Sequence, residues 1–465
     1  RIECILQKSE INKKENRMNI FFVSLGCDKN LVDSEVMLGL LDAKGYQIVD
    51  DETQADVIVI NTCCFIHDAK EESINTILEM AQYKEQNLKA LVVAGCLAER
   101  YKDEILKEIP EIDAVLGTTS YDSIVEAVNT ALEENTGEHF EHYESIDYLP
   151  DNSEVERVVT TGNHMAYLKI AEGCDKRCSY CIIPKIRGRF RSVPMQELLN
   201  EAKRLASEGV KELVLVAQET TLYGKDLTGE KQLPLLLHEL CKIEGIEWIR
   251  LLYCYPEEIT DELIKVIKTE EKVCNYIDMP IQHSENRILQ RMGRRTSRED
   301  LVAVIKKLRK EIPDITIRTT LITGFPGESQ EDHEGLMNFV EECQFDRLGV
   351  FTYSPEEDTL AATFEDQIDE EVKEERRDEL MSLQQEISYE HTQQLVGKTI
   401  KVMVEGYLFE DDIYVGRSYM DAPKVDGCVF INSPEELMTG DFVYVKITQG
   451  REYDVIGEVD YEFTK

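Results

Sequence analysis

The sequence has 465 residues, of which 42% are hydrophobic, enough for about three domains that each bury a core. Its 92 acidic and 52 basic side chains give a net charge of −40, which disfavours nucleic acid as a partner and favours a basic one. The chain has no apolar run long enough to cross a membrane and no secretory signal pattern, so a cytoplasmic protein without membrane attachment is expected.

Residues 18–134 alternate between apolar strands and amphipathic helices. The strands are expected at 20–25, 57–60, 91–94 and 114–116, with helices beginning near residues 31, 69 and 99. This order predicts an α/β domain built on a parallel sheet. Residues 1–17 are left out of the fold prediction, and whether they belong to the native protein stays open. Residues 135–163 are acidic, are broken by glycine and proline, and are predicted to be a linker.

A second alternation of strands and helices fills residues 164–391. Six strands are expected near 165–170, 212–217, 248–253, 276–281, 315–322 and 347–352, with helices such as 195–207 and 298–310 between them. Six βα units predict an open partial barrel, (βα)6, with its site at the carboxyl ends of the strands.

The last part of the chain changes character. Residues 369–395 predict one charged helix. Residues 392–465 then contain five short β-rich runs, at 399–404, 413–416, 428–431, 442–448 and 454–459, punctuated by glycine. They predict a small antiparallel β-barrel.

Three of the thirteen cysteines form a C-x3-C-x2-C motif directly after the first strand of the predicted partial barrel: Cys174, Cys178 and Cys181. Three thiolates leave one iron of a 4Fe-4S cluster without a protein ligand, which is where a chelating cofactor binds. A zinc site is the alternative, but it requires a fourth Cys or His, and none occurs in the next 50 residues.

Three more cysteines each follow a predicted strand of the first domain: Cys27, Cys63 and Cys96. The carboxyl ends of parallel strands meet at one edge of a sheet, so these thiols are expected to converge and to bind a second cluster with an open iron. Three buried structural thiols are the alternative reading. Cys64 leaves open which of two neighbouring thiols is the ligand. Six other cysteines show no ligand spacing: Cys4, Cys241, Cys254, Cys274, Cys343 and Cys428.

With both groups of three cysteines, the chain resembles the methylthiotransferase family of the radical S-adenosylmethionine (SAM) superfamily, and within it the RimO-type enzymes. The matching stretches are residues 24–35 (SLGCDKNLVDSE), 181–188 (CIIPKIRG), 217–224 (AQETTLYG), 280–283 (PIQH) and 351–357 (FTYSPEE). Asp28 stands where the family usually has proline, and Cys64 where it usually has glycine. Neither difference removes a ligand.

The resemblance implies an enzyme whose chemistry resides in two 4Fe-4S clusters, with no further catalytic residue. Cys174, Cys178 and Cys181 would hold the radical SAM cluster, and Cys27, Cys63 and Cys96 an auxiliary cluster. SAM would serve as methyl donor and radical source, sulfide or polysulfide as the sulfur source, and a flavodoxin or ferredoxin as electron donor. The C-terminal barrel would be a TRAM domain that binds the substrate.

SAM contacts are expected at Tyr180, at Gln218 and Glu219 after one strand, and at Thr323 and Gly324 in a TGFPGE turn after another. Small residues in such a turn permit close approach of a ligand, although a tight turn without a ligand would use them equally. Three arginines follow the C-x3-C-x2-C motif, at 187, 189 and 191. They would contact an acidic group on substrate or SAM, or form only a solvated face.

Charge separates the candidate substrates. RimO-type enzymes modify the β-carbon of an aspartate in the twelfth protein of the small ribosomal subunit, whereas their relatives of the MiaB type modify a tRNA adenosine. Residues 392–465 contain seven basic and fourteen acidic side chains, a net charge of −7, which favours a basic ribosomal protein over tRNA. A non-catalytic iron-sulfur scaffold is a third candidate. Oligomeric state, and the choice between free protein and assembled subunit as substrate, stay open.

Overall fold

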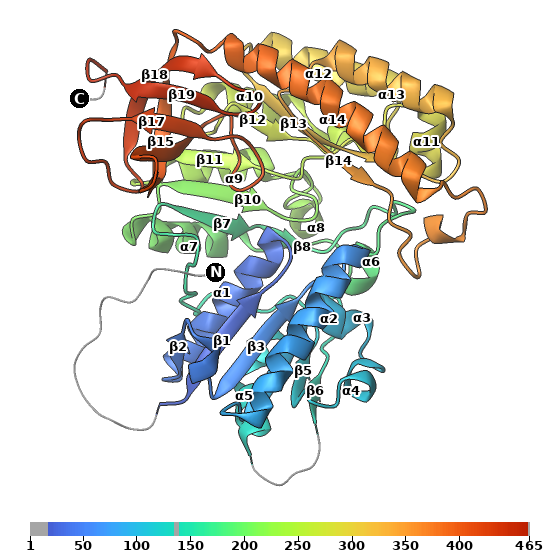
Figure 1. Cartoon of the computed structure of the whole chain (residues 1–465), viewed down its shortest axis with the longest axis vertical. Helices are drawn as coiled ribbons and strands as arrows, with labels where there is room; N and C mark the ends of the chain where they lie inside the picture. The colour runs from blue at the N-terminus through green and yellow to red at the C-terminus, as the bar shows by residue number, and fades with distance from the viewer. Residues whose placement is uncertain (1–16, 134–138, 464–465) are drawn as a thin grey trace. The chain divides into compact units, whose positions relative to one another are not determined.

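The computed structural model describes residues 17–133 and 139–463, and the interpretation of Cys4 as a cysteine without a ligand role lies outside them. The chain divides into two compact units (Figure 1). The first contains the described residues up to Gly162 together with Tyr167–Arg177 and Cys181–Val193. The second contains Asn163–Ala166, Cys178–Tyr180 and the chain from Pro194 onward. No helix among these residues is long and apolar enough to span a membrane.

The first unit is built on a six-stranded sheet in the order β2-β1-β3-β4-β5-β6. Every pairing in it is parallel, as predicted. The strands are β1 (Asn19–Ser24), β2 (Gln47–Val49), β3 (Val57–Thr62), β4 (Ala90–Gly95), β5 (Ala114–Leu116) and β6 (Phe140–His142). The helices are α1 (Asp28–Ala43), α2 (His67–Ala81), α3 (Cys96–Arg100), α4 (Ile105–Glu108) and α5 (Ile124–Leu132).

The central strands are hydrophobic on both sides because helices cover both faces of the sheet. In β3, Val57 and Val59 pack with α1 and α5, whereas Ile58 and Ile60 pack with α2, α3 and α4. Residues that alternate along a strand point to opposite faces, so an uninterrupted apolar run supplies both cores.

The segment predicted as an acidic linker differs from that expectation. It contributes β6 to the sheet beside β5. Farther along, the Arg157 guanidinium donates to a carboxylate oxygen of Glu35 in α1 at 2.6 Å, and both side chains are buried. The chain approaches α1 closely at Gly39, where an added Cβ would lie 2.3 Å from the carbonyl oxygen of Glu156. Composition alone suggested an exposed segment, but these pairings attach it to the domain.

The predicted partial barrel lies mostly in the second unit. Its strands are β7 (Met165–Lys169), which begins in the second unit and continues from Tyr167 in the first, β10 (Glu212–Val216), β11 (Trp248–Leu251), β12 (Tyr276–Asp278), β13 (Thr316–Thr323) and β14 (Arg347–Thr352). They form two three-stranded sheets, β11-β10-β7 and β12-β13-β14, joined by a parallel bridge between Ile249 and Val273. Two short strands of the first unit, β8 (Ala171–Glu172) and β9 (Arg191–Ser192), pair with each other on either side of the cysteine motif in the sequence.

Amphipathic helices cover this partial barrel. In α7 the buried residues Leu198, Ala202 and Leu205 recur at helical spacing, which places them on one face. Serine caps begin α12 and α13, each with an aspartate that completes a capping box. The helices of the second unit are α7 (Met195–Ser207), α8 (Lys225–Thr228), α9 (Leu233–Cys241), α10 (Asp261–Thr269), α11 (Asn286–Arg291), α12 (Arg298–Glu311), α13 (Gln330–Cys343) and α14 (Glu370–Gln393). The short helix α6 (Ile183–Ile186) belongs to the first unit, where Ile186 packs into the core beside α3.

The C-terminal strands form the predicted closed barrel, in the order β15-β16-β17-β19-β18. They are β15 (Thr399–Leu408), β16 (Ile413–Ser418), β17 (Val429–Asn432), β18 (Phe442–Gly450) and β19 (Val455–Val459). The sequence predicts a barrel that is antiparallel throughout. Four of the strand pairings are antiparallel, but β17 pairs with β19 in parallel.

This C-terminal barrel contacts the amino ends of the partial-barrel strands through buried charges. The Glu212 carboxylate at the start of β10 accepts from Arg250 at 2.8 Å and from Arg417 of β16 at 2.6 Å, and all three side chains are buried. Burial raises the pKa of Glu212, but the two arginines outweigh it and lower the pKa from 4.5 to about 2. The stabilisation is therefore complete above about pH 4.5 and is lost as the pH falls toward 2.

Glu212→Gln is expected to lower the free energy of unfolding by about 3–5 kcal/mol, because it leaves two buried arginines short of a counter-charge. Chemical denaturation of the full chain at neutral pH measures the loss. Glu247→Gln is the matched control, since Glu247 pairs with Lys401 across the same junction at 3.1 Å but is half exposed. Equal stability of both variants would show that the buried cluster does not fasten the C-terminal barrel.

Candidate iron-sulfur and SAM site

The first three candidate cysteines all follow strands at the carboxyl edge of the six-stranded sheet. Cys27 caps the amino end of α1 after β1, Cys63 comes directly after β3, and Cys96 is the first residue of α3 after β4. The strand order reverses its direction of growth between β1 and β3, which makes this edge the topological switch point. Open parallel sheets bind ligands at such points.

The three thiols converge there. Gly26 has a φ of +87° and lies so close to Cys63 that an added Cβ would be 2.8 Å from the Cys63 sulfur. Burial raises the pKa of the Cys63 thiol, and the charge of Cys27 raises it further. Burial also holds the pKa of Cys96 well above its usual value, while Arg187 lowers it and the other thiols raise it. Cys27, Cys63 and Cys96 are thus close enough for their charges to influence one another.

The structure distinguishes Cys64 from Cys63. The Cys64 side chain is fully buried, and its thiol donates to the carbonyl oxygen of Cys96 at 3.1 Å. Cys63 instead faces the turn that carries Gly26 and Cys27. This geometry favours Cys63 as the ligand.

A buried charge cluster lies beside these thiols. The Arg187 guanidinium, 2% exposed, donates to Asp33 at 2.7 Å, to Glu172 at 3.2 Å and to the Cys96 sulfur at 3.4 Å. Lys169 pairs with both carboxylates as well. Arg187 is therefore not part of a solvated surface, and its guanidinium is already bound within the protein, so neither predicted role for this arginine holds. Arg189, by contrast, is 78% exposed.

The donor set fits an iron-sulfur cluster. Thiolates are the usual ligands of such clusters, and a cation beside them offsets part of their charge. Among the described residues no group of three or more His, Cys, Asp or Glu side chains could hold a single metal ion. A cubane cluster places its thiolates on separate corners and so needs a wider arrangement than one ion does.

The three cysteines of the C-x3-C-x2-C motif lie in the loop after β8. Cys174 and Cys178 are buried and Cys181 is half-buried. In the first unit, the Cys174 amide donates to the carbonyl oxygen of Gly188 at 3.1 Å, which closes the loop. In the second unit, the Cys178 sulfur lies 4.0 Å from the Tyr255 hydroxyl.

Tyr255 and Arg294 are neighbours of Cys178 that the sequence prediction missed. The Arg294 guanidinium lies 4.3 Å from the centre of the Tyr255 ring and donates to the carbonyl oxygen of Pro280 at 3.0 Å. Burial lowers the pKa of Arg294, but Tyr180, Tyr255 and Cys178 outweigh it, so the net pKa is raised. An exposed-looking RMGRR stretch gave no signal of this burial.

The predicted SAM ligands include residues with defined contacts within the protein, namely Tyr180, Glu219, Thr323 and Gly324. Tyr180 packs edge-on against Phe325 at 6.5 Å between ring centres. Glu219 accepts from the Thr221 amide at 3.0 Å. Gln218 lies beside Glu219 in the loop after β10. No contact in the structure tests any of these as a SAM ligand, and they stay predictions.

The turn at Thr323 and Gly324 is closely packed. The Thr323 hydroxyl donates to the carbonyl oxygen of Lys373 at 3.2 Å, and the Gly324 amide donates to Glu328 at 2.9 Å. A Cβ at Gly324 would lie 2.1 Å from the Lys373 side chain. Glycine is required here by its φ of +66° and by contact with α14, and this requirement holds with or without a ligand, so both interpretations of the turn stay open.

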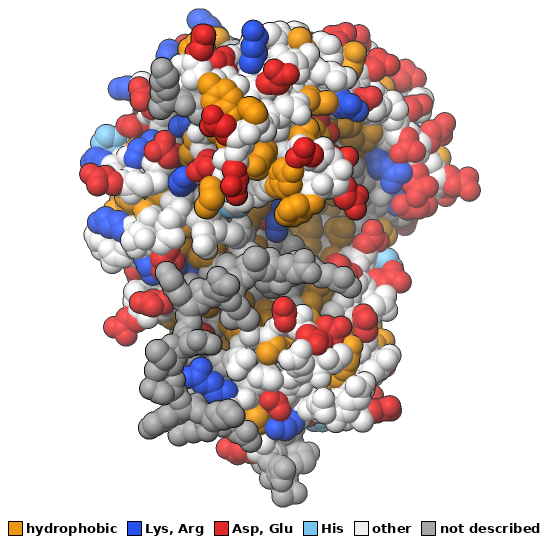
Figure 2. Space-filling view, turned by 60° about the vertical axis from the view of Figure 1, so that its left-hand side comes forward, with side chains coloured by type: hydrophobic (Ala, Val, Ile, Leu, Met, Phe, Trp, Pro, Cys, Tyr) orange, Lys and Arg blue, Asp and Glu red, His pale blue; other side chains and the backbone are white. Residues whose placement is uncertain are grey.

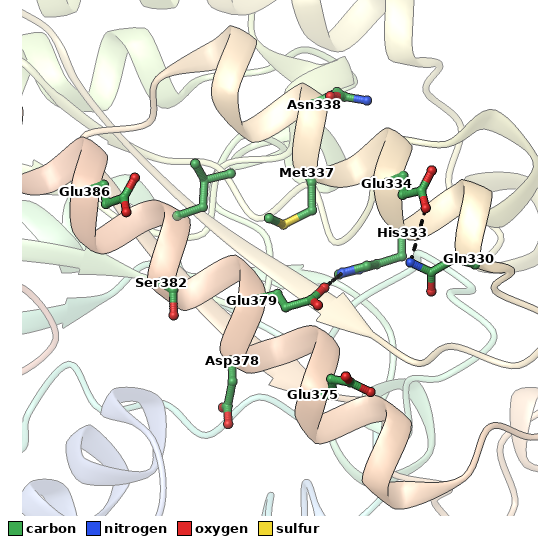
Figure 3. A pocket seen from close by; sticks show the side chains of 11 residues that line it. Gln330, His333, Glu334, Met337, Asn338, Glu375, Asp378, Glu379, Ser382 and Glu386 are labelled. Atoms are coloured by element: carbon green, nitrogen blue, oxygen red, sulfur yellow. Dashed lines mark hydrogen bonds and ion pairs between the residues drawn. The ribbon is translucent and has the colours of Figure 1, made fainter.

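A separate groove runs between α13 and α14 (Figure 3). Acidic side chains lie on both of its walls, and His333 shares a 2.7 Å contact with Glu379 across it. None of the candidate cluster or SAM residues lines this groove.

Known proteins resemble this chain over nearly its whole length. Ribosomal protein uS12 methylthiotransferase RimO of Lachnoclostridium phytofermentans is 61% identical over 444 residues, covering 95% of this chain and 100% of that protein. The protein of the same name from Clostridioides difficile is 50% identical, covering 96% and 99%. The chain belongs to the RimO methylthiotransferase family.

Three family descriptions match the RimO-type chain in sequence order. Residues 19–117 match the uncharacterized protein family UPF0004, residues 168–340 the radical SAM superfamily, and residues 396–459 the TRAM domain. These matches confirm the predicted family and three-part organisation. The six-stranded sheet is thus the UPF0004 part, and the C-terminal barrel is the TRAM domain.

Solved structures share the fold at low sequence identity. The radical SAM methyltransferase TsrM from Kitasatospora setae, solved with cobalamin and a [4Fe-4S] cluster, has a TM-score of 0.55 and 13% identity, covering 83% of this RimO-type chain and 79% of that one. The same enzyme with tryptophan and a SAM analogue has a TM-score of 0.53, covering 72% and 73%. At this identity the likeness establishes the fold alone.

Cys63→Ala is expected to abolish the auxiliary cluster. Cys64→Ala is expected to retain it, because the Cys64 thiol is hydrogen-bonded to a backbone carbonyl oxygen. Each change is made in a chain that also carries Cys174→Ala, Cys178→Ala and Cys181→Ala, so that a cluster in the UPF0004 part alone remains. Anaerobic iron and sulfide analysis with Mössbauer spectroscopy measures the outcome. Retention in Cys63→Ala with loss in Cys64→Ala would make Cys64 the ligand.

Proposed function

We propose that this enzyme adds a methylthio group to the β-carbon of an aspartate in ribosomal protein uS12, with two 4Fe-4S clusters and SAM. The observation that carries the proposal is the convergence of Cys27, Cys63 and Cys96 at the switch point of a UPF0004 sheet, in a chain that also bears the radical SAM motif. The relatives named for this activity at 50–61% identity support it.

The chain's own residues would hold and separate the two clusters. Cys174, Cys178 and Cys181 would bind the radical SAM cluster, and Cys27, Cys63 and Cys96 the auxiliary one. When bound, the clusters and SAM supply the one-electron reduction, the carbon radical and the sulfur that the reaction needs. Each trio leaves one iron open, so neither cluster is saturated by protein ligands.

Electrostatics supports a basic protein as the substrate. Acidic side chains are spread over the face drawn in Figure 2, in keeping with 92 acidic against 52 basic residues overall. The TRAM domain shares this bias, with a net charge of −7 over residues 392–465. Such a surface attracts a lysine- and arginine-rich ribosomal protein and repels a phosphate backbone.

The remaining partners follow from the chemistry. A flavodoxin or ferredoxin would deliver electrons, and sulfide or polysulfide would replace the transferred sulfur. A ribosomal substrate would place the enzyme in the cytoplasm. These assignments rest on the reaction class.

The reconstituted enzyme, with SAM and a reductant, is expected to add one methylthio group to uS12 and none to tRNA. Mass spectrometry of both macromolecules in parallel reactions measures this, and the rate with uS12 should fall as salt screens the attraction between opposite charges. Methylthiolation of tRNA without modification of uS12 would overturn the proposed substrate and favour the MiaB-type activity.

Cys178→Ala is expected to abolish release of 5′-deoxyadenosine from SAM, since it removes a ligand of the radical SAM cluster. Cys241→Ala is the matched control, because Cys241 is a half-buried cysteine at the end of α9 without ligand spacing. Chromatography of dithionite-reduced reactions measures the product. A wild-type enzyme that releases none would instead support the non-catalytic scaffold.

A further inference from the structure

Arg187 contacts Cys96 directly and is also held by Asn30, which binds the turns that precede Cys27 and Cys63. Its second guanidinium nitrogen donates to the Asn30 side-chain oxygen at 2.8 Å and to the Cys96 sulfur at 3.4 Å. The Asn30 amide nitrogen in turn donates to the carbonyl oxygens of Leu25 at 2.6 Å and Thr62 at 3.3 Å. Leu25 precedes Cys27 by two residues, and Thr62 directly precedes Cys63.

Charge balance does not require the contact with sulfur. Lys169 and Arg187 already match Asp33 and Glu172, so the four buried charges are neutral among themselves. The first guanidinium nitrogen makes both of the carboxylate contacts of Arg187. The second is directed to a neutral amide and a thiol, so it can donate to the Cys96 sulfur while the first keeps both carboxylate contacts.

We infer that Arg187 is a positioning residue that donates a hydrogen bond to the Cys96 sulfur and raises the reduction potential of the auxiliary cluster. The inference rests on the proposed binding of a cluster by Cys27, Cys63 and Cys96. A reduced cluster carries one more negative charge, so a buried cation and a hydrogen bond at its sulfur ligand stabilise the reduced form. Burial strengthens both effects because water screens them less.

Potentiometry followed by electron paramagnetic resonance tests the inference in the full chain without the radical SAM cysteines. Arg187→Met combined with Asp33→Asn keeps the remaining Lys169 and Glu172 pair neutral, so no unbalanced charge is buried. Relative to the parent chain with Arg187 and Asp33 intact, whose four buried charges are also balanced, the midpoint potential is expected to fall by at least about 59 mV, a tenfold change in the one-electron reduction equilibrium. Arg189→Gln, at a 78% exposed site, is the matched control and should leave it unchanged.

A second measurement uses the unaltered Arg187 and so does not depend on the folding of a variant. Chains labelled with ¹⁵N in the arginine guanidinium should show a ¹⁵N hyperfine coupling to the reduced auxiliary cluster in pulsed resonance spectra. The coupling should vanish in Arg187→Lys, which keeps the charge without the labelled group.

The outcomes separate the inference from the proposed function. A chain without the radical SAM cysteines that holds no iron would overturn the auxiliary cluster itself. A cluster that is present but shows neither a ¹⁵N coupling nor a lower potential in the double variant would overturn the role of Arg187 alone.

Discussion

Parallel pairing in the UPF0004 sheet is the constraint on which the candidate site depends, because it brings the carboxyl ends of β1, β3 and β4 to one edge. The turns that leave these strands are unusually tight. Gly26 and Gly95 have φ values of +87° and +95°, and a Cβ on Gly95 would lie 2.3 Å from the Asn61 side chain. A larger side chain at Gly26 or Gly95 would push apart the turns that follow these strands, and would thereby separate the cysteines that follow the turns. The site is thus defined by backbone geometry before any cluster is bound.

Two buried charge clusters hold together segments that strand pairing alone does not connect. One surrounds Arg187 beside Cys96, and the other joins Glu212 to Arg250 and Arg417. Each surrounds its carboxylates with cations at hydrogen-bond distance, which offsets the cost of removing charge from water. Apolar packing alone could hold these segments together, whereas a hydrogen-bonded cluster also fixes the orientation of the charged side chains. In the cluster around Arg187, this orientation places the guanidinium beside the Cys96 sulfur.

Features that depend on local sequence pattern could be predicted, namely most strands of the first sheet and the cysteines that follow them. Strand periodicity located β1, β3, β4 and β5, and cysteines immediately after strands identified the thiols that converge. Pattern could not reveal Arg187, because its partner Asp33 lies 154 residues away and the surrounding RGRFR stretch reads as solvated. The edge strand β6 was missed for a related reason: Phe140–His142 is short and polar, and only its pairing with β5 makes it a strand. Contacts distant in sequence decide both cases.

The position of the TRAM domain on the radical SAM partial barrel limits how a substrate can bind. Its contacts begin just before β7 at His164 and reach Arg347 at the start of β14, so it covers the amino ends of the strands. The radical SAM motif and the predicted SAM contacts follow the carboxyl ends. An eight-residue strand such as β13 separates these ends by roughly 26 Å. A substrate bound at the TRAM domain, as the proposed attraction to its acidic surface implies, would have to extend at least that far to react, as a macromolecule does and a small metabolite does not.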